Sequence, residues 1–122
     1  MIKNILALVF IGLSYQLIAQ AQLKFEDTKK SFGFVKKGEQ VKLTYQFTNT
    51  GNQPLVITNA KAECSCTKVI WPKEPILPSK SNSIEVLFDT SPTYDRQNRV
   101  VEVFSNDPKS PQKIRFKGVV LK

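Results

Sequence analysis

The stretch Val41-Lys42-Leu43-Thr44-Tyr45-Gln46-Phe47-Thr48 decides the fold, because apolar side chains occupy its odd positions and polar side chains its even positions. Successive side chains of a β-strand point to opposite faces, so this alternation is typical of a strand with one buried and one solvated face. No stretch of the sequence shows a convincing 3.6-residue helical period. The sequence therefore predicts an all-β protein.

The same alternation, or a shorter β-prone run, recurs on both sides of this stretch. The further strands are expected at Leu23–Phe25, Ser31–Val35, Leu55–Ala62, Thr67–Trp71, Ile84–Phe88, Arg99–Ser105 and Lys113–Val120. All seven prolines lie between these segments, where a missing backbone donor is tolerated. Short strands separated by turns, with no helices to cross over, predict one immunoglobulin-like antiparallel β-sandwich of about seven or eight strands.

The first residues have the pattern of a secretory signal peptide. A single charge at Lys3 precedes a largely apolar run, residues 5–18, and Ala19-Gln20-Ala21 supplies small residues that signal peptidase accepts. The run of about 14 residues is shorter than the ~20 that span a membrane, so we expect cleavage and no membrane-spanning segment afterwards. The sequence predicts a signal peptide over residues 1–21, a domain over residues 22–122, and export to the periplasm or the outside of the cell.

The composition excludes several functions. The 122 residues carry a formal net charge of +8 and include no histidine, which removes Ser/His and Cys/His nucleophile pairs and histidine-ligated metal sites. Lys and Arg are spread along the whole chain rather than gathered in one arm. We favour the interpretation that they are solvated strand faces, with a weak attraction to anionic envelope polymers as the functional alternative, and expect no nucleic-acid partner.

Cys64-Ser65-Cys66 is the one unusual cluster. An even pair of cysteines in an oxidising compartment normally forms a disulfide. Two residues of regular strand separate their Cα atoms by about 6.6 Å, at the upper edge of what a disulfide tolerates, so the bond requires a bend. The loop is so short that the chain-entropy model gives only about 1.5 kcal/mol of stabilisation.

Three interpretations of this pair stay open. A local disulfide could pin a bend at the end of the preceding strand, two thiolates could bind Cu(I), or the thiols could exchange disulfides. Zinc would lack two ligands, and the sequence after residue 21 has no methionine, the other soft ligand of copper. Glu63 would raise the pKa of a neighbouring thiol, whereas Lys61 and Lys68 would lower it.

Other candidate residues carry weaker signals. Trp71 could contact a sugar or peptide, although a tryptophan at a strand end usually closes a core. Asp89 and Asp95 flank a polar loop with Tyr94 and Arg96, which could bind a cation or close a hydrogen-bonded turn, and the turn is favoured. We find no paired carboxylates, phosphate-binding glycine loop or serine elbow, and therefore expect no catalytic residues, no metal and no cofactor.

The order of short motifs resembles the domain of unknown function 1573 family over nearly all of the domain. These motifs are Phe47-Thr48-Asn49-Thr50-Gly51, Pro54-Leu55-Val56-Ile57, Cys64-Ser65-Cys66-Thr67, Pro75-Ile76-Leu77-Pro78, Ile84-Glu85-Val86, Phe88-Asp89-Thr90, Ser105-Asn106 and Gly118-Val119-Val120. The resemblance implies a small exported bacterial domain with an immunoglobulin-like sandwich, similar to abnormal-spindle, hydin and major sperm protein modules. It implies no established activity.

Two positions depart from the pattern of that family. Ser65 stands where the family usually has glycine, so a tight bend with positive φ is harder to form. The family's hairpin near Asp95–Asn98 commonly includes glycine, and its absence predicts a longer or differently closed turn here. We interpret Asn49 and Gly51 as turn residues, and expect Asn106 to hydrogen-bond the backbone of its own loop.

The sequence thus favours a monomeric, non-enzymatic module that is structural or binds a protein or an envelope polymer. Binding would use loops or would pair a strand with an exposed sheet edge. The alternative is a thiol module that uses Cys64 and Cys66 for disulfide exchange or Cu(I) binding. Replacing both cysteines would abolish the activity of a thiol module and leave that of an interaction module nearly intact.

Overall fold

The structure is a computed structural model that describes residues 18–122. Most of the predicted signal peptide, residues 1–17, lies outside the described residues. The described part contains eight strands and no helix. The strands are β1 (Leu23–Phe25), β2 (Lys29–Lys36), β3 (Gln40–Asn49), β4 (Ile57–Ala62), β5 (Thr67–Ile70), β6 (Ser81–Asp89), β7 (Asp95–Ser105) and β8 (Gln112–Leu121). The predicted all-β class and number of strands are confirmed.

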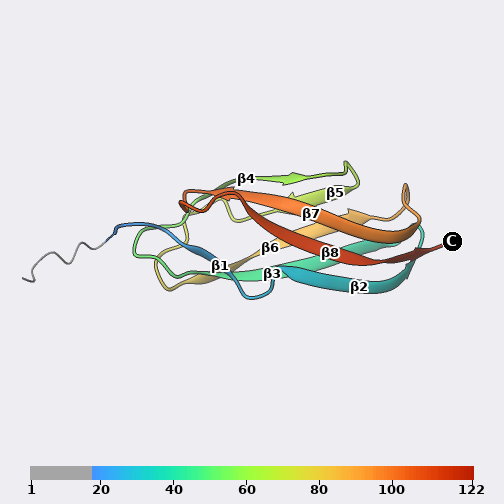
Figure 1. Ribbon diagram of the computed structural model, residues 1–122, viewed down its shortest axis with the longest axis horizontal. Helices are drawn as coiled ribbons and strands as arrows, with labels where there is room; N and C mark the ends of the chain where they lie inside the picture. Colours follow the sequence, from blue (N-terminus) through green and yellow to red (C-terminus); the bar gives the residue numbers. More distant parts are fainter. Residues whose placement is uncertain (1–17) are drawn as a thin grey trace, which may run out of the picture.

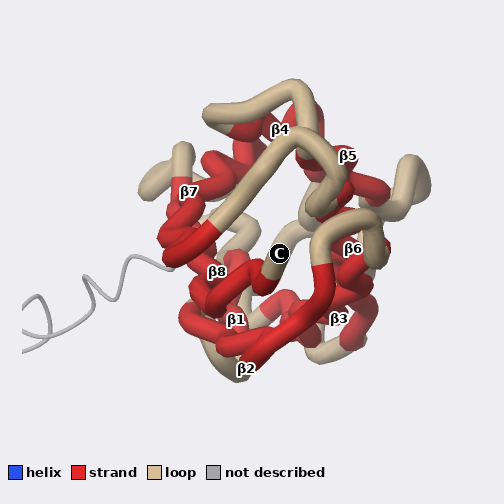
Figure 2. Tube along the Cα trace, turned by 90° about the vertical axis from the view of Figure 1, so that its right-hand side faces the viewer, coloured by secondary structure: helices blue, strands red, loops and turns tan. Residues whose placement is uncertain are grey.

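The strands form two four-stranded sheets that pack face to face (Figures 1 and 2). Sheet A has the order β1-β3-β6-β5, and sheet B has the order β2-β8-β7-β4. Every pair is antiparallel except β2 with β8, which run parallel. This exception to the antiparallel expectation arises because the chain crosses from sheet A to sheet B between β1 and β2 without reversing its direction (Figure 1).

The core lies between the inner faces of the two sheets. The odd positions of β3 face the core as the alternation predicts: Tyr45 and Phe47 are at most 1% exposed, and Leu43 is half-buried. Val86 and Phe88 of β6 are fully buried, and Phe116 of β8 contributes from the opposite sheet. The rings of Phe88 and Phe116 have centroids 5.3 Å apart. Because each such side chain stabilises the fold by about 1.5–3 kcal/mol on burial, this inner layer supplies the main driving force for folding.

Tyr45 also connects the two sheets by a polar contact. Its hydroxyl donates a hydrogen bond of 2.8 Å to the carbonyl oxygen of Arg115 on β8. Burial raises the pKa of the Tyr45 hydroxyl above its ordinary value, because the phenolate would lose its hydration there. The phenol therefore stays protonated and keeps its role as a donor.

The prediction of a turn at Asp95–Asn98 is wrong, because these residues belong to β7. β6 ends at Asp89, and the connection over residues 90–94 leads into β7, which lies in the other sheet. A connection between two sheets closes no hairpin, so the glycine that a tight hairpin needs is not required. Asp95 itself takes a φ of 69°, at the first residue of the new strand.

Candidate functional site

The cysteine pair lies in a turn over residues 63–66, between β4 of sheet B and β5 of sheet A. Cys64 and Cys66 form a disulfide with a Cα–Cα distance of 5.1 Å. This distance is shorter than extended backbone would give, because the chain turns here from one sheet to the other. Among the described residues, only Ser79 and Asp95 combine positive φ with a side chain. Ser65 therefore fits in this turn without entering the left-handed region.

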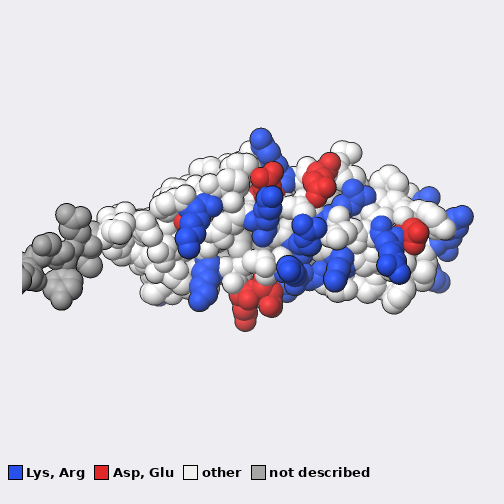
Figure 3. All heavy atoms as spheres, viewed as in Figure 1, with Lys and Arg blue, Asp and Glu red and all other residues white. Residues whose placement is uncertain are grey.

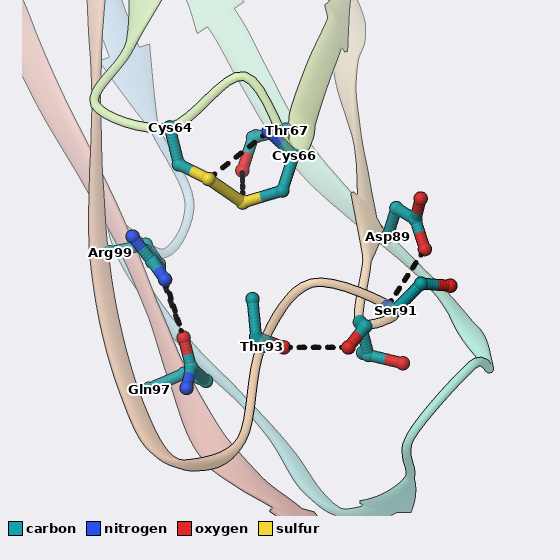
Figure 4. The surroundings of a disulfide bond; sticks show 9 residues. Cys64, Cys66, Thr67, Asp89, Ser91, Thr93, Gln97 and Arg99 are labelled. Atoms are coloured by element: carbon teal, nitrogen blue, oxygen red, sulfur yellow. Dashed lines mark hydrogen bonds between the residues drawn. A yellow bond between two sulfur atoms is a disulfide. The ribbon is translucent and has the colours of Figure 1, made fainter.

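The disulfide joins the two cysteines across the turn (Figure 4), and both cysteines pack against the core. Cys66 is 8% exposed, and its N–H donates to Sγ of Cys64 at 3.1 Å, while Cys64 is half-buried. Thiol exchange and Cu(I) binding both need a thiolate. Neither sulfur is a thiolate in the disulfide, so Cu(I) binding would begin with its reduction. Disulfide exchange would begin with attack on one of its sulfurs by a thiolate of another molecule.

Intact-mass measurement tests the bonding of this pair. We expect no alkylation without a reductant and two alkyl groups after reduction under denaturing conditions. Because the closed loop is so short, the Cys64→Ser/Cys66→Ser double variant should lose only about 1.5 kcal/mol in the free energy of unfolding. Two alkyl groups on the unreduced, unfolded protein, or a loss of more than about 4 kcal/mol, which is the scale of a long-range bridge, would contradict this account.

Asn49 is more than a turn residue. Its side chain is fully buried at the end of β3. Its Oδ1 accepts hydrogen bonds from the backbone N–H groups of Gln22 at 3.2 Å and Gly51 at 3.0 Å. Its Nδ2 donates to the carbonyl oxygens of Gln53 at 2.8 Å and Ile76 at 2.9 Å. One amide therefore holds together the segment before β1, the turn after β3 and the loop before β6.

Gly51 and Asn106 lie in the loops at this same end of the sandwich. A Cβ on Gly51 would overlap the backbone of Gln20, so glycine permits the close approach of the segment before β1. The expectation for Asn106 is wrong. Its side chain bonds the neighbouring loop, accepting from Val56 N at 2.8 Å and donating to Pro54 O at 3.0 Å. The pairing of β4 with β7 brings that loop beside it.

Asp107 is a structural residue that the sequence analysis missed. It is 5% exposed, and its Oδ2 accepts from Leu23 N at 2.8 Å and from Gln112 Nε2 at 3.0 Å. Its Oδ1 accepts from Lys109 N at 2.8 Å. The position before Pro108 indicated a turn, but nothing in the sequence indicated the bond to β1, which joins residues 84 positions apart.

The two remaining candidates have local roles in the structure. Trp71 is half-buried and packs against the core, and Nζ of Lys73 lies 3.3 Å from the centroid of its ring. Oδ1 of Asp89 accepts from Ser91 N at 2.9 Å, and this bond lowers the pKa of the Asp89 carboxyl because it stabilises the charged form. The loop after Asp89 is therefore the hydrogen-bonded turn that the sequence favoured, and Thr93 adds a bond to Thr90 O.

β5 is an edge strand that directs backbone groups away from its sheet. It pairs only with β6, and the N–H of Asp89 donates to the carbonyl of Cys66 at 2.8 Å. Hydrogen-bonded pairs alternate in an antiparallel ladder, so Lys68 and Ile70 also bond β6. The N–H and C=O of Val69 therefore point away from β6, towards the open side of the sheet.

The other three edges are shorter or interrupted. β1 has three residues. β2 and β4 both lose their regular register, between Ser31 and Gly33 and between Ile57 and Asn59. Bulges and short strands are the usual means by which proteins prevent pairing at their edges. β5 has four residues and keeps a regular register with β6, so it is longer than β1 and, unlike β2 and β4, is not interrupted by a bulge.

Comparisons with known proteins show which sequences and structures this chain is similar to. The model of the family described as "Protein of unknown function (DUF1573)" matches residues 23–120. No curated protein matches the chain in sequence. Within residues 18–122 we find no helix with the length and apolar character needed to cross a membrane.

Solved structures share the fold at low sequence identity. A Porphyromonas gingivalis W83 protein of unknown function matches with a TM-score of 0.73 and 18% identity over 88% of this chain and 51% of its own. This chain thus spans about half the length of that protein. The ASH/PapD-like domain 7 of human CEP192 matches with a TM-score of 0.70 and 7% identity over 92% and 94% of the two chains. The E. coli chaperone DraB matches with a TM-score of 0.55 and 11% identity over 82% and 54%.

Proposed function

The chain belongs to the DUF1573 family, and from its own edges and loops we propose that it is an exported, non-catalytic interaction module that binds an extended protein segment along β5. The outward N–H and C=O of Val69 carry this proposal. An added strand would find a donor and an acceptor there at the spacing of a normal ladder.

Side chains around β5 support binding at this edge. Ile70 is 44% exposed on the outer face, and Lys68 beside it is the one charged residue of the strand. Trp71 follows directly and the disulfide turn precedes β5, so both ends of the strand are held in place. A strand that is already ordered loses little conformational entropy when a partner adds to it.

A binding role agrees with how the polar groups of the described residues are used. Between residues 18 and 122, every buried side-chain N or O atom has a hydrogen-bond partner. The buried Asn49 and Asp107 use their polar atoms to bond backbone groups of neighbouring segments. Export is supported by the predicted signal peptide and by a disulfide, which persists in oxidising compartments.

Peptide selection tests the proposed edge. Peptides of random sequence would be selected against the wild-type protein, and their affinities compared for Val69→Pro and Val69→Ala. Proline removes the outward N–H without removing a bond to β6, so we expect affinity to fall roughly tenfold or more, the value of a hydrogen bond plus the clash of the ring.

Val69→Ala is the matched control. It removes the same half-buried side chain and keeps the N–H, so its affinity should stay within about threefold of wild type, because main-chain pairing is unaffected. Two results would show that the edge is not the binding site. In one, the selected peptides bind Val69→Pro as tightly as wild type; in the other, their affinity for Val69→Ala falls as much as their affinity for Val69→Pro.

A further inference from the structure

The outer face of sheet B gathers positive charge from all four of its strands. The register pairs Lys113 with Glu102 and Lys117 with Asn98 on the solvent side, opposite the buried Ile114 and Phe116. The cations that point to this side are Lys29, Lys36, Lys61, Arg96, Lys113, Arg115 and Lys117. Two carboxylates accompany them: Glu102 lies opposite Lys61 and Lys113, and Glu63 lies beside it and accepts from Val100 N at 2.7 Å. Figure 3 shows Lys and Arg along most of the length of this face, with few acidic residues between them.

The outer face of sheet A differs in charge. Its strands present Lys24, Lys42 and Lys68, together with Glu85 and Asp89. Nζ of Lys42 lies 3.5 Å from Oε1 of Glu85, and this pair is the one salt bridge among residues 18–122. The cations of sheet B therefore have too few carboxylates to neutralise them, and their fields add over one surface.

The central strand of sheet B arranges its cations in a line. Lys113, Arg115 and Lys117 alternate with buried residues, so neighbouring charges are about 6.7 Å apart along β8. Lys117 and Arg96 line a shallow depression of 610 Å³ at one end of this row. Phe34 and Val119 also line it, together with one carboxylate, Asp95. Phe34 is 75% exposed. The face therefore combines a row of charges with an apolar patch at one end.

We propose that the outer face of sheet B binds a linear acidic polysaccharide lying along β8. A repeat of carboxylates along an extended polymer matches a row of evenly spaced cations, and exposed Phe34 suits the apolar face of a sugar ring. The surface is an open sheet face, and residues 18–122 contain no helix that could enter a nucleic-acid groove. It lies on the opposite sheet from β5, so binding here is independent of the proposed strand addition.

Binding to polygalacturonate, a polymer with one carboxylate per sugar, tests this inference. We expect salt-sensitive binding that weakens roughly a hundredfold in the triple variant Lys113→Gln/Arg115→Gln/Lys117→Gln, from about 1 kcal/mol per cation at a charged surface. The single variants Lys113→Gln and Lys117→Gln, which leave Arg115 intact, should each weaken binding about fivefold. Thermal unfolding of each variant checks that the fold is retained.

The triple variant Lys24→Gln/Lys42→Gln/Lys68→Gln on sheet A is the matched control, because it removes the same net charge. It should weaken binding less than about threefold, since these lysines face away from the polymer. Equal losses in the two triple variants would show attraction to net charge alone and overturn the proposal. Absence of binding to polygalacturonate, or binding of poly-glutamate or single-stranded oligo-dT at least as tight, would also overturn it.

Discussion

Replacing Asn49 by aspartate is expected to lower the free energy of unfolding by about 3–5 kcal/mol at neutral pH, the scale of an uncompensated buried charge. The change is nearly isosteric, so the loss is electrostatic. In the wild-type protein, Nδ2 of Asn49 donates to the carbonyl oxygens of Gln53 and Ile76. A carboxylate oxygen in its place can only accept, so it would be repelled by both carbonyl oxygens. The total free energy of unfolding of a small domain is only about 5–15 kcal/mol, so this loss is a large fraction of it. The melting temperature should therefore fall by roughly 20 °C.

The sign of the pH dependence gives a second test of this variant. Burial and the two carbonyl oxygens would raise the folded-state pKa of the introduced carboxyl above its unfolded value. The penalty is then full above the folded pKa and shrinks as pH falls, because the protonated form is neutral and can donate one bond. Urea unfolding at pH 7 and pH 4.5 should show a gap from wild type that narrows at the lower pH.

Asn98→Asp is the matched control for this prediction. Asn98 is exposed on β7, and its Oδ1 accepts from Nη1 of Arg115 at 2.8 Å. A carboxylate there would face a guanidinium and water, so stability should change by less than about 0.5 kcal/mol. If Asn49→Asp also stays within about 1 kcal/mol of wild type, the amide does not hold this end of the sandwich together.

Replacing Gly51 by alanine is expected to cost about 2–3 kcal/mol in a chain that retains residues 18–21. The new Cβ would overlap the carbonyl of Gln20 and lie 2.7 Å from Gln22 N. These are backbone atoms, so the segment before β1 would have to move. It would then lose the bonds between Gln20 and Asn52, and Ala21, now 2% exposed, would leave the core.

The same substitution reports on the predicted mature N-terminus. A chain that begins at Gln22 lacks Gln20 and Ala21, so the remaining clash of the new Cβ is with Gln22 N. We therefore expect Gly51→Ala to lower the free energy of unfolding of this shorter chain by less than about half of its effect in the longer chain. Thermal unfolding of wild type and Gly51→Ala in both chain lengths measures the difference. An equal loss in the two lengths would mean that the segment before residue 22 does not pack against Gly51.

The strands were predictable because burial follows a period of two. Tyr45 and Phe47 on β3, Val86 and Phe88 on β6, and Ile114 and Phe116 on β8 are buried where the alternation places them. The parallel pairing of β2 with β8 could not be predicted in this way, since the pattern of one strand does not specify the direction of its neighbour.

The loop contacts and the charged face were not predictable from sequence spacing. Asp107 meets Leu23, and Asn106 meets Pro54 and Val56, only after the sheets have formed. Lys29, Lys61 and Lys117 are far apart in the sequence, and share one surface because alternate residues of four strands point the same way. Ligand contacts at Trp71 and thiol chemistry at Cys64 and Cys66 stay predictions.

The proposal that a partner adds a strand to β5 is tested most directly by amide hydrogen exchange, read by NMR, of the wild-type protein with and without a selected peptide. The N–H of Val69 points away from β6, so in the free protein it should exchange faster than the N–H of Lys68, which bonds β6. Peptide binding should slow exchange at Val69 and leave the rate at Lys68 largely unchanged. An exchange rate at Val69 that the bound peptide does not alter would contradict strand addition at this edge.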